Sequence, residues 1–363
     1  MKEFVWGEAL VPLWEGDIVY EETAMLLADR WGGLPEIGLL CPVDRILSVR
    51  DYGRRREYCA GRDYALTETG DFSVPDGSAL YDLACPYDRY YQERYIPGVN
   101  RPMLGGGAQL RTEASGGCGG LTDFQLRITY RRRTAFPGPI PPAKGGLLPR
   151  TAGRLKRGEH FTVALLGDSI SAGWSASGFA GLPPFQPPYF RLFTEALRQR
   201  CPVREHNLSV GGKTSVWGRE AAQTAALAAA EPDLAIVAFG MNDGASERMT
   251  AEIFRGNVAE IVRAVRSRCP HTEWLLVSPM LPNGELGYEE GISVLQHQHE
   301  YAAALAELER EFGGVAVADV TSVHRALLGR KAYRDMSANN INHPNDFLHR
   351  VYAQVLLRTL CPG

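Results

Sequence analysis

Short apolar runs alternate with longer amphipathic segments from residue 161 to the end of the chain. Runs of this length that are apolar throughout are typical of parallel strands buried on both faces. They predict strands at residues 161–166, 234–239, 274–277 and 315–317, with a weaker one near 203–210. Helical spacing predicts helices at about residues 189–200, 219–230, 250–268, 295–312 and 346–360. This part is therefore expected to be α/β, with a five-stranded parallel sheet between helices.

The first part of the chain has a different pattern. Residues 1–135 contain short alternating or β-rich pieces, such as 17–20 and 124–130, separated by Gly, Pro and Asp turns. They predict a small β domain. Residues 136–154 form the predicted linker, because the prolines of AFPGPIPPAKGGLLP disfavour a regular helix. Residues 155–363 form the second domain.

Composition narrows the classes of partner. The 363 residues are 45% hydrophobic and 22% charged, so the chain can bury a sizeable core in about two domains. The chain has a formal net charge of -3 and therefore lacks the excess of positive charge expected of proteins that bind nucleic acid or anionic membranes. The opening residues lack an apolar signal-peptide core, and no apolar run is long enough to span a membrane. We therefore expect a cytoplasmic protein.

A serine follows the first strand of the predicted sheet. The strand ends in LLGDSIS at residues 165–171. In open α/β sheets ligands bind beyond the carboxyl ends of the strands, so Ser169 lies where a nucleophile is useful. The pattern Gly-x-Ser-x-Gly is absent because Ser171 replaces its second glycine, which argues against an α/β-hydrolase fold. The alternative is a serine that only caps the next turn.

A second polar block, NHPNDFLH at residues 342–349, precedes the last predicted helix. Asp346 and His349 are three residues apart, so on a first helical turn they share a face. The carboxylate can then hold one imidazole nitrogen while the other nitrogen addresses a third group. With Ser169 this predicts a Ser-His-Asp triad. The alternative is an aspartate that caps the helix beside a structural histidine.

Two more loops follow the second and third predicted strands, at the same edge of the sheet as Ser169. They are NLSVGGKTS at residues 207–215 and FGMNDG at 239–244. A glycine N–H and an asparagine amide can stabilise a developing oxyanion without adding charge, and Gly212 and Asn242 suit these two roles. Each loop taken alone is more typical of ordinary turn chemistry, and only the combination of the loops indicates an oxyanion site.

Together, GDSIS, NLSVGGKTS, FGMND and NDFLH resemble the four blocks of the GDSL/SGNH hydrolase superfamily, in order and position, over about residues 155–363. The resemblance implies a flavodoxin-like fold with a five-stranded parallel sheet. It implies Ser169 as nucleophile, Asp346 as orienting acid and His349 as general base. The implied reaction is ester hydrolysis through an acyl-enzyme, which requires no metal or cofactor.

The same resemblance implies three oxyanion donors, which are the amide of Ser169, Gly212 and Asn242. The glycine block departs slightly from the superfamily pattern. Ser209 occupies the place of the first glycine in the commoner Gly-x-x-Gly spacing, and Gly211 precedes Gly212. Gly212 is the better match of the two glycines.

A β domain before such a hydrolase domain resembles the two-domain carbohydrate O-acetylesterases. This implies a jelly-roll-like β-sandwich beside the active site and an acetyl ester on a sugar or oligosaccharide as the partner molecule. Trp174, Phe185 and Tyr189, in a loop rich in proline and aromatic residues, are the expected substrate wall unless they only pack the loop. A general short-chain esterase acting on non-sugar esters is the alternative, and a homo-oligomer is left open.

Three other functions would require features that the sequence does not support. Gly212-Lys213-Thr214 resembles the end of a phosphate-binding loop, but Asn207 stands where that motif requires its first glycine. His297 and His299 are two apart on a predicted helix and point to different sides, so they do not form a metal pair. A non-catalytic binding module would require the four blocks to be vestigial.

Overall fold

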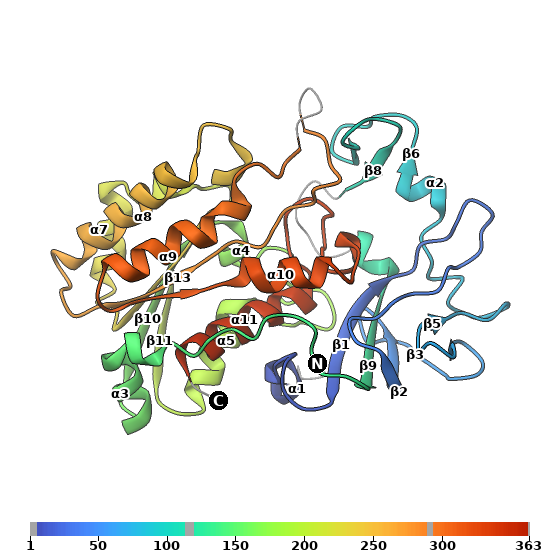
Figure 1. Cartoon of the computed structure of the whole chain (residues 1–363), viewed down its shortest axis with the longest axis horizontal. Helices are drawn as coiled ribbons and strands as arrows, with labels where there is room; N and C mark the ends of the chain where they lie inside the picture. Colours follow the sequence, from blue (N-terminus) through green and yellow to red (C-terminus); the bar gives the residue numbers. More distant parts are fainter. Residues whose placement is uncertain (1–5, 113–119, 289–292, 362–363) are drawn as a thin grey trace.

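The computed structural model describes residues 6–112, 120–288 and 293–361 (Figure 1). Five parallel strands form its central sheet in the order β11-β10-β12-β13-β14. They are β10 (Phe161–Gly167), β11 (Val203–Asn207), β12 (Leu234–Ala238), β13 (Glu273–Val277) and β14 (Val315–Ala318). All five predicted strands are confirmed. The edge strand β11 has no fully buried residue, which explains its weaker apolar signal.

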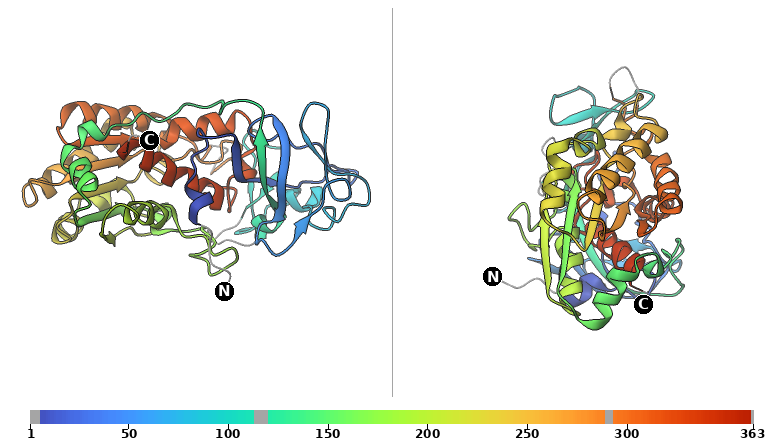
Figure 2. Two further views of the ribbon diagram at one scale, coloured as in Figure 1. Left: turned by 90° about the horizontal axis from the view of Figure 1, so that it is seen from below. Right: turned by 90° about the vertical axis from the view of Figure 1, so that its left-hand side faces the viewer.

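Helices cover both faces of this sheet (Figures 1 and 2). Odd-numbered residues of β10, such as Val163, belong to one core cluster with α5 (Tyr189–Arg198), α10 (Val320–Leu328) and α11 (Asp346–Leu360). Even-numbered residues, such as Ala164, belong to a second cluster with α7 (Ala221–Ala229), α8 (Ala251–Arg266) and α9 (Tyr301–Glu311). The sheet is thus buried on both sides, as its apolar runs predict. The predicted flavodoxin-like α/β class is confirmed.

Three of the longer helices differ from the sequence prediction. Helix α9 begins at Tyr301, six residues after the predicted start at residue 295. Helix α3 (Pro149–Arg157) begins inside the predicted linker of residues 136–154, because Pro149 occupies the first helical turn, where its missing N–H costs nothing. The last six residues of the predicted linker are therefore helical. Helix α10 was not predicted, since it follows β14 after Asp319 alone.

The N-terminal part is antiparallel β, as expected. Its main sheet has the order β1-β9-β2-β3, with β1 (Ile18–Met25), β2 (Val43–Asp51), β3 (Glu57–Tyr58) and β9 (Gln125–Arg132). Two smaller sheets pair β4 (Ala65–Leu66) with β5 (Phe72–Ser73), and β6 (Tyr91–Gln92) and β7 (Asn100–Pro102) with β8 (Gln109–Arg111). Short helices are α1 (Trp6–Leu10), α2 (Tyr87–Tyr90), α4 (Ser169–Ala172) and α6 (Ser215–Gly218).

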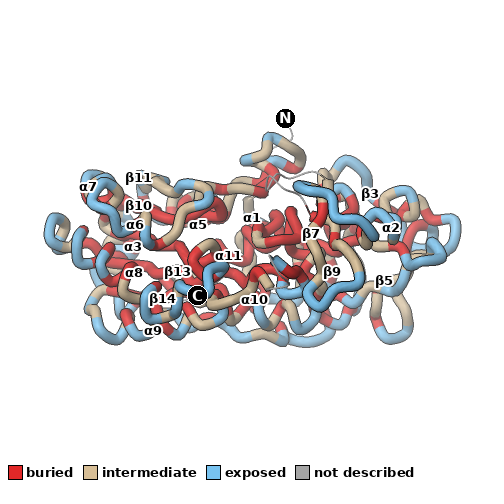
Figure 3. Tube along the Cα trace, turned by 90° about the horizontal axis from the view of Figure 1, so that it is seen from above, coloured by how far each residue is buried: buried red, intermediate tan, exposed pale blue. Residues whose placement is uncertain are grey.

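The main sheet of the β domain packs against helix α11 of the α/β domain. Val19 of β1, Ile128 of β9 and Val355 of α11 belong to one continuous core cluster. Buried segments occupy the middle of both parts of the molecule (Figure 3). The β domain therefore supports the helix at whose N-terminus the fourth sequence block lies.

No helix among the described residues has both the length and the apolar character needed to cross a membrane.

Candidate active site

Ser169 lies at the carboxyl end of β10 and is the first residue of α4. Asp168 caps this helix, because its Oδ1 accepts a hydrogen bond from the N–H of Ile170 at 3.0 Å. Ser169 Oγ lies 2.8 Å from Nε2 of His343. Only 5% of Ser169 and 7% of His343 is exposed, so water competes little for this hydrogen bond. The structure thus pairs a hydroxyl with a ring nitrogen that can accept its proton.

His343 is held by the turn that precedes α11. The Oδ1 atom of Asn339 accepts hydrogen bonds from the backbone N–H groups of Ile341, Asn342 and His343, at 2.9, 3.0 and 2.9 Å. The carbonyl of His343 accepts a further bond from Ser337 Oγ at 2.9 Å. The imidazole is therefore presented on a rigid turn.

The environment of His343 favours its neutral form. Burial and, to a lesser extent, the neighbouring His349 lower the pKa of His343 to about 4. A neutral imidazole has one nitrogen free to act as a base near neutral pH. The other nitrogen, Nδ1, is buried and has no hydrogen-bond partner among the described residues. No carboxylate from this part of the chain orients the ring.

The two expected oxyanion residues lie on loops that are tied together. Gly212 has φ +75°, which suits a glycine, and Asn242 Nδ2 donates to the carbonyl of Lys213 at 2.9 Å. An amide nitrogen carries two hydrogens, so the second remains for another acceptor. Ser169 contributes a backbone N–H at the start of α4, and such N–H groups have no acceptor within the helix. Three neutral donors are thus available at the loops that follow β10, β11 and β12.

Asp243 connects the same two loops. Its Oδ1 accepts from the N–H of Ser215 at 2.9 Å and from the hydroxyl of Ser215 at 2.5 Å, while Oδ2 accepts from the N–H of Gly240 at 3.1 Å. Asp243 is buried, so each of these bonds also satisfies a carboxylate that water does not reach. The loop of Gly212 is consequently fixed relative to the loop of Asn242.

His349 does not contact Ser169, so the geometry expected of it is wrong. Both of its ring nitrogens are occupied by backbone groups: Nε2 donates to the carbonyl of Trp174 at 3.1 Å, and Nδ1 accepts from the N–H of Tyr189 at 3.3 Å. Burial lowers the pKa of His349 to about 4. His349 therefore fastens both ends of the loop of residues 174–189 to α11.

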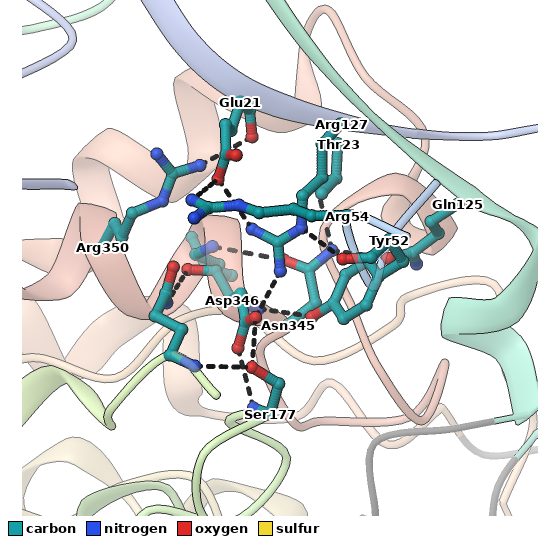
Figure 4. A network of polar contacts seen from close by, with 12 residues as sticks. Glu21, Thr23, Tyr52, Arg54, Gln125, Arg127, Ser177, Asn345, Asp346 and Arg350 are labelled. Atoms are coloured by element: carbon teal, nitrogen blue, oxygen red, sulfur yellow. Dashed lines mark hydrogen bonds and ion pairs between the residues drawn. The ribbon is translucent and has the colours of Figure 1, made fainter. Parts of the chain in front are cut away.

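Asp346 does not orient His349 by a hydrogen bond either. Its carboxylate accepts from the N–H and the hydroxyl of Ser177, at 2.8 and 2.7 Å, and forms a buried ion pair with Arg127 of the β domain (Figure 4). The spacing of three residues does place both side chains on the first turn of α11, but that turn faces the loop and the β domain. The expected Asp346–His349 pair is therefore wrong, and both residues anchor one loop.

The three expected wall residues have different environments. Trp174 lies beside the site, with its ring centroid 5.8 Å from that of His343, and its indole packs on Gly211. Phe185 is 40% exposed on the same loop. Tyr189 is completely buried and its hydroxyl lies 2.8 Å from Ser171 Oγ, so its expected place in a substrate wall is wrong. Of the three, Trp174 is the residue that the structure brings to His343.

Sequence reasoning missed His343 although the residue lies in the quoted block NHPNDFLH. The choice of His349 rested on its helical spacing from Asp346. A signal for His343 was present, since Pro344 makes the preceding residue part of a loop, and reactive residues are frequent on loops held by a rigid scaffold.

A family model covers all four sequence blocks. This model, described as the GDSL-like Lipase/Acylhydrolase family, matches residues 165–351. A search of curated proteins found no match.

Solved structures resemble parts of the chain. A two-domain esterase (CEX) active on acetylated mannans, co-crystallised with mannopentaose, is 25% identical, with a TM-score of 0.44 over 59% of this chain and 53% of that one. The chain thus spans about half the length of that structure. A variant of an acetyl xylan esterase, Axe2 from Geobacillus stearothermophilus, is 16% identical, with a TM-score of 0.44 over 55% of this chain and 93% of that one.

Proposed function

The chain belongs to the GDSL-like lipase/acylhydrolase family, and we propose that it is a serine esterase that removes acetyl groups from O-acetylated carbohydrate. One observation carries the catalytic proposal, which is the 2.8 Å hydrogen bond between Ser169 Oγ and His343 Nε2. The proposed nucleophile remains Ser169. The proposed general base is His343 in place of His349.

The first half of the reaction forms an acyl-enzyme. Ser169 Oγ attacks the ester carbonyl carbon while His343 Nε2 takes the hydroxyl proton. The carbonyl oxygen becomes an oxyanion, to which the N–H groups of Ser169 and Gly212 and the amide of Asn242 donate. The intermediate collapses when the C–O bond to the sugar breaks, and the imidazolium returns its proton to the sugar oxygen.

The second half regenerates the enzyme. Water attacks the acyl carbon as His343 accepts one of its protons, and the bond between the acyl group and Ser169 Oγ then breaks. The proton returns to Ser169, and acetic acid leaves. Because Nδ1 of His343 has no partner among the described residues, we infer that Ser169 and His343 act as a dyad, without the orienting carboxylate of a triad.

A small acyl group is supported by the close packing of Trp174 beside the site. The indole of Trp174 packs so closely on Gly211 that a Cβ there would come within 3.0 Å of the ring. A long acyl chain would therefore have to displace packed side chains, whereas an acetyl group is small.

A carbohydrate leaving group is supported by the contact of the β domain with the turn of His343. Asn340 Nδ2 donates to the carbonyl of Arg111 at 2.9 Å and to the hydroxyl of Tyr90 at 3.0 Å. The β domain therefore contacts the turn that carries His343. A bulky leaving group beside this turn would touch both domains.

The test is a panel of p-nitrophenyl esters from acetyl to dodecanoyl, run beside acetylated oligosaccharides with released acetate measured. We expect kcat/KM to fall steeply from acetyl to butyryl and beyond, since each added methylene costs about 1–3 kcal/mol in a tight pocket. Faster turnover of octanoyl than of acetyl esters would refute the acetylesterase. Hydrolysis of acetyl esters without release of acetate from oligosaccharides would favour the general short-chain esterase.

A further inference from the structure

A cavity of about 530 Å³ lies between the β domain and the turn that carries His343. Its β-domain wall consists of strands β7 and β8 together with Tyr95. Its other wall comes from the α/β domain and includes Gly287, Tyr288 and Ile341. The volume is within the range of pockets that bind small molecules.

The two walls are joined by backbone hydrogen bonds. The N–H of Gly287 donates to the carbonyl of Pro102 at 2.8 Å, and the N–H of Leu104 donates to the carbonyl of Glu285 at 2.8 Å. These bonds connect the β7 region of the β domain directly to the segment of Glu285 and Gly287. The cavity is thus formed by both domains before any ligand binds.

The lining has the chemistry that sugars require. Tyr95 and Tyr288 are 61% and 47% exposed, and an exposed aromatic ring can stack against the apolar face of a sugar. Arg101 lies over the ring of Tyr288, 5.5 Å from its centroid. Asn100, Gln109 and Thr112 add uncharged polar groups to the lining, and none of the described lining residues is a carboxylate. A fatty chain would instead prefer a continuous apolar surface.

The cavity is coupled to the reacting atoms through Ile341. This residue lines the cavity, and Asn339 Oδ1 binds its N–H in the same turn that binds the N–H of His343. Two residues of backbone span at most about 7 Å. One wall of the cavity and the proposed general base therefore belong to the same turn.

We propose that this cavity binds the carbohydrate part of the ester, with Tyr95 and Tyr288 stacking on successive sugar rings. The inference rests on the proposed function for the identity of the ligand, and it adds the place where the sugar chain is held. The β domain thereby supplies half of a saccharide site.

Binding can be measured apart from catalysis in the Ser169→Ala variant. Unacetylated cello-, xylo- and manno-oligosaccharides are titrated into the Ser169→Ala protein, and binding is measured by calorimetry. The same titrations are done with the double variants that also carry Tyr288→Ala or Tyr95→Ala. We expect at least one oligosaccharide to bind, and each tyrosine substitution to weaken it about tenfold. Tyr288→Phe keeps the ring and should retain most of the affinity. Trp31→Ala, which removes an aromatic side chain 90% exposed and outside the cavity, is the matched control.

Kinetics give a second readout in the active enzyme. Tyr288→Ala should lower the ratio of kcat/KM for acetylated oligosaccharide to kcat/KM for p-nitrophenyl acetate by about tenfold, mainly through KM. Absence of oligosaccharide binding, or binding that the tyrosine substitutions leave unchanged, would overturn the cavity as a sugar site. Tyrosine-dependent binding in an enzyme that releases no acetate from oligosaccharides would support the site and refute the proposed function.

Discussion

Arg127, on the central β9 strand of the N-terminal sheet, forms an ion pair with Asp346 in the first turn of α11, and neither side chain has exposed surface. Arg127 also donates to Glu21 at 3.0 Å and to the carbonyl of Tyr52 at 2.7 Å (Figure 4). Asp346 in turn binds Ser177 of the loop that begins beside Trp174. The β domain thus neutralises the carboxylate that anchors the active-site loop.

Arg127→Met should destabilise the protein by about 3–5 kcal/mol, because it leaves Asp346 buried without its cationic partner. Unfolding by urea measures the change. Arg50→Met is the matched control, since Arg50 lies opposite Arg127 in strand β2 but pairs with Glu57 at the surface, with 39% and 56% of the two side chains exposed. This control should cost no more than about 1 kcal/mol. Equal effects of the two substitutions would contradict the assigned role of Arg127.

Substitutions of His343 and His349 should have different effects, the first on kcat and the second on the melting temperature. His343→Ala should lower kcat by about 10⁴-fold, and the double variant with Ser169→Ala should be little worse than either single variant. His349→Gln should chiefly lower the melting temperature, because burial leaves little water to replace its bonds to Trp174 and Tyr189. Steady-state kinetics and thermal unfolding are measured on both. The assignment would be reversed if His349→Gln lost kcat at an unchanged melting temperature while His343→Ala stayed active. His349 would then be the general base.

Asn242→Ala should lower kcat by about 10²–10³-fold with KM nearly unchanged, because the amide is engaged mainly in the transition state. The same side chain holds the carbonyl of Lys213, so a loosened loop must be distinguished from a lost donor. Ser215→Ala loosens the link to Asp243 without removing an oxyanion donor. An equal loss of kcat in Ser215→Ala would assign the Asn242 effect to loop position.

The acid limb of kcat/KM should lie near pH 4, because burial lowers the pKa of His343 to about 4 and the base must be neutral. The free energy of unfolding should also fall at acid pH. The unfolded state, in which the pKa is near 6.5, binds more protons between these values, so stability is complete above about pH 6.5 and falls as the pH approaches 4. A pH–rate profile checks the acid limb of kcat/KM, and urea unfolding at each pH checks the stability. An acid limb near 6.5 in an enzyme that stays folded would contradict the buried neutral base.

Much of the α/β architecture could be read from the pattern of apolar residues. Strands buried on both faces carry continuous apolar runs, and these predicted β10, β12, β13 and β14 to within one residue at either end. In the β domain the pairing of β1 with β9 joins segments about a hundred residues apart, and no local pattern indicates such a partner. An arginine is normally expected at an exposed position. Arg127 is nevertheless completely buried, because its charge is paired with Glu21 and Asp346.

The sequence by itself determined the fold class, the edge of the sheet where the reactive loops meet and the residues Ser169, Gly212 and Asn242 that follow three successive strands. These depend on local spacing and on the topology of parallel sheets, which a single sequence carries. Only the tertiary structure decided that His343 and not His349 lies against Ser169, and that Asp346 binds Arg127 and Ser177. Helical spacing predicts which side chains share a face of α11. The residues that this face contacts depend on how α11 packs against the β domain.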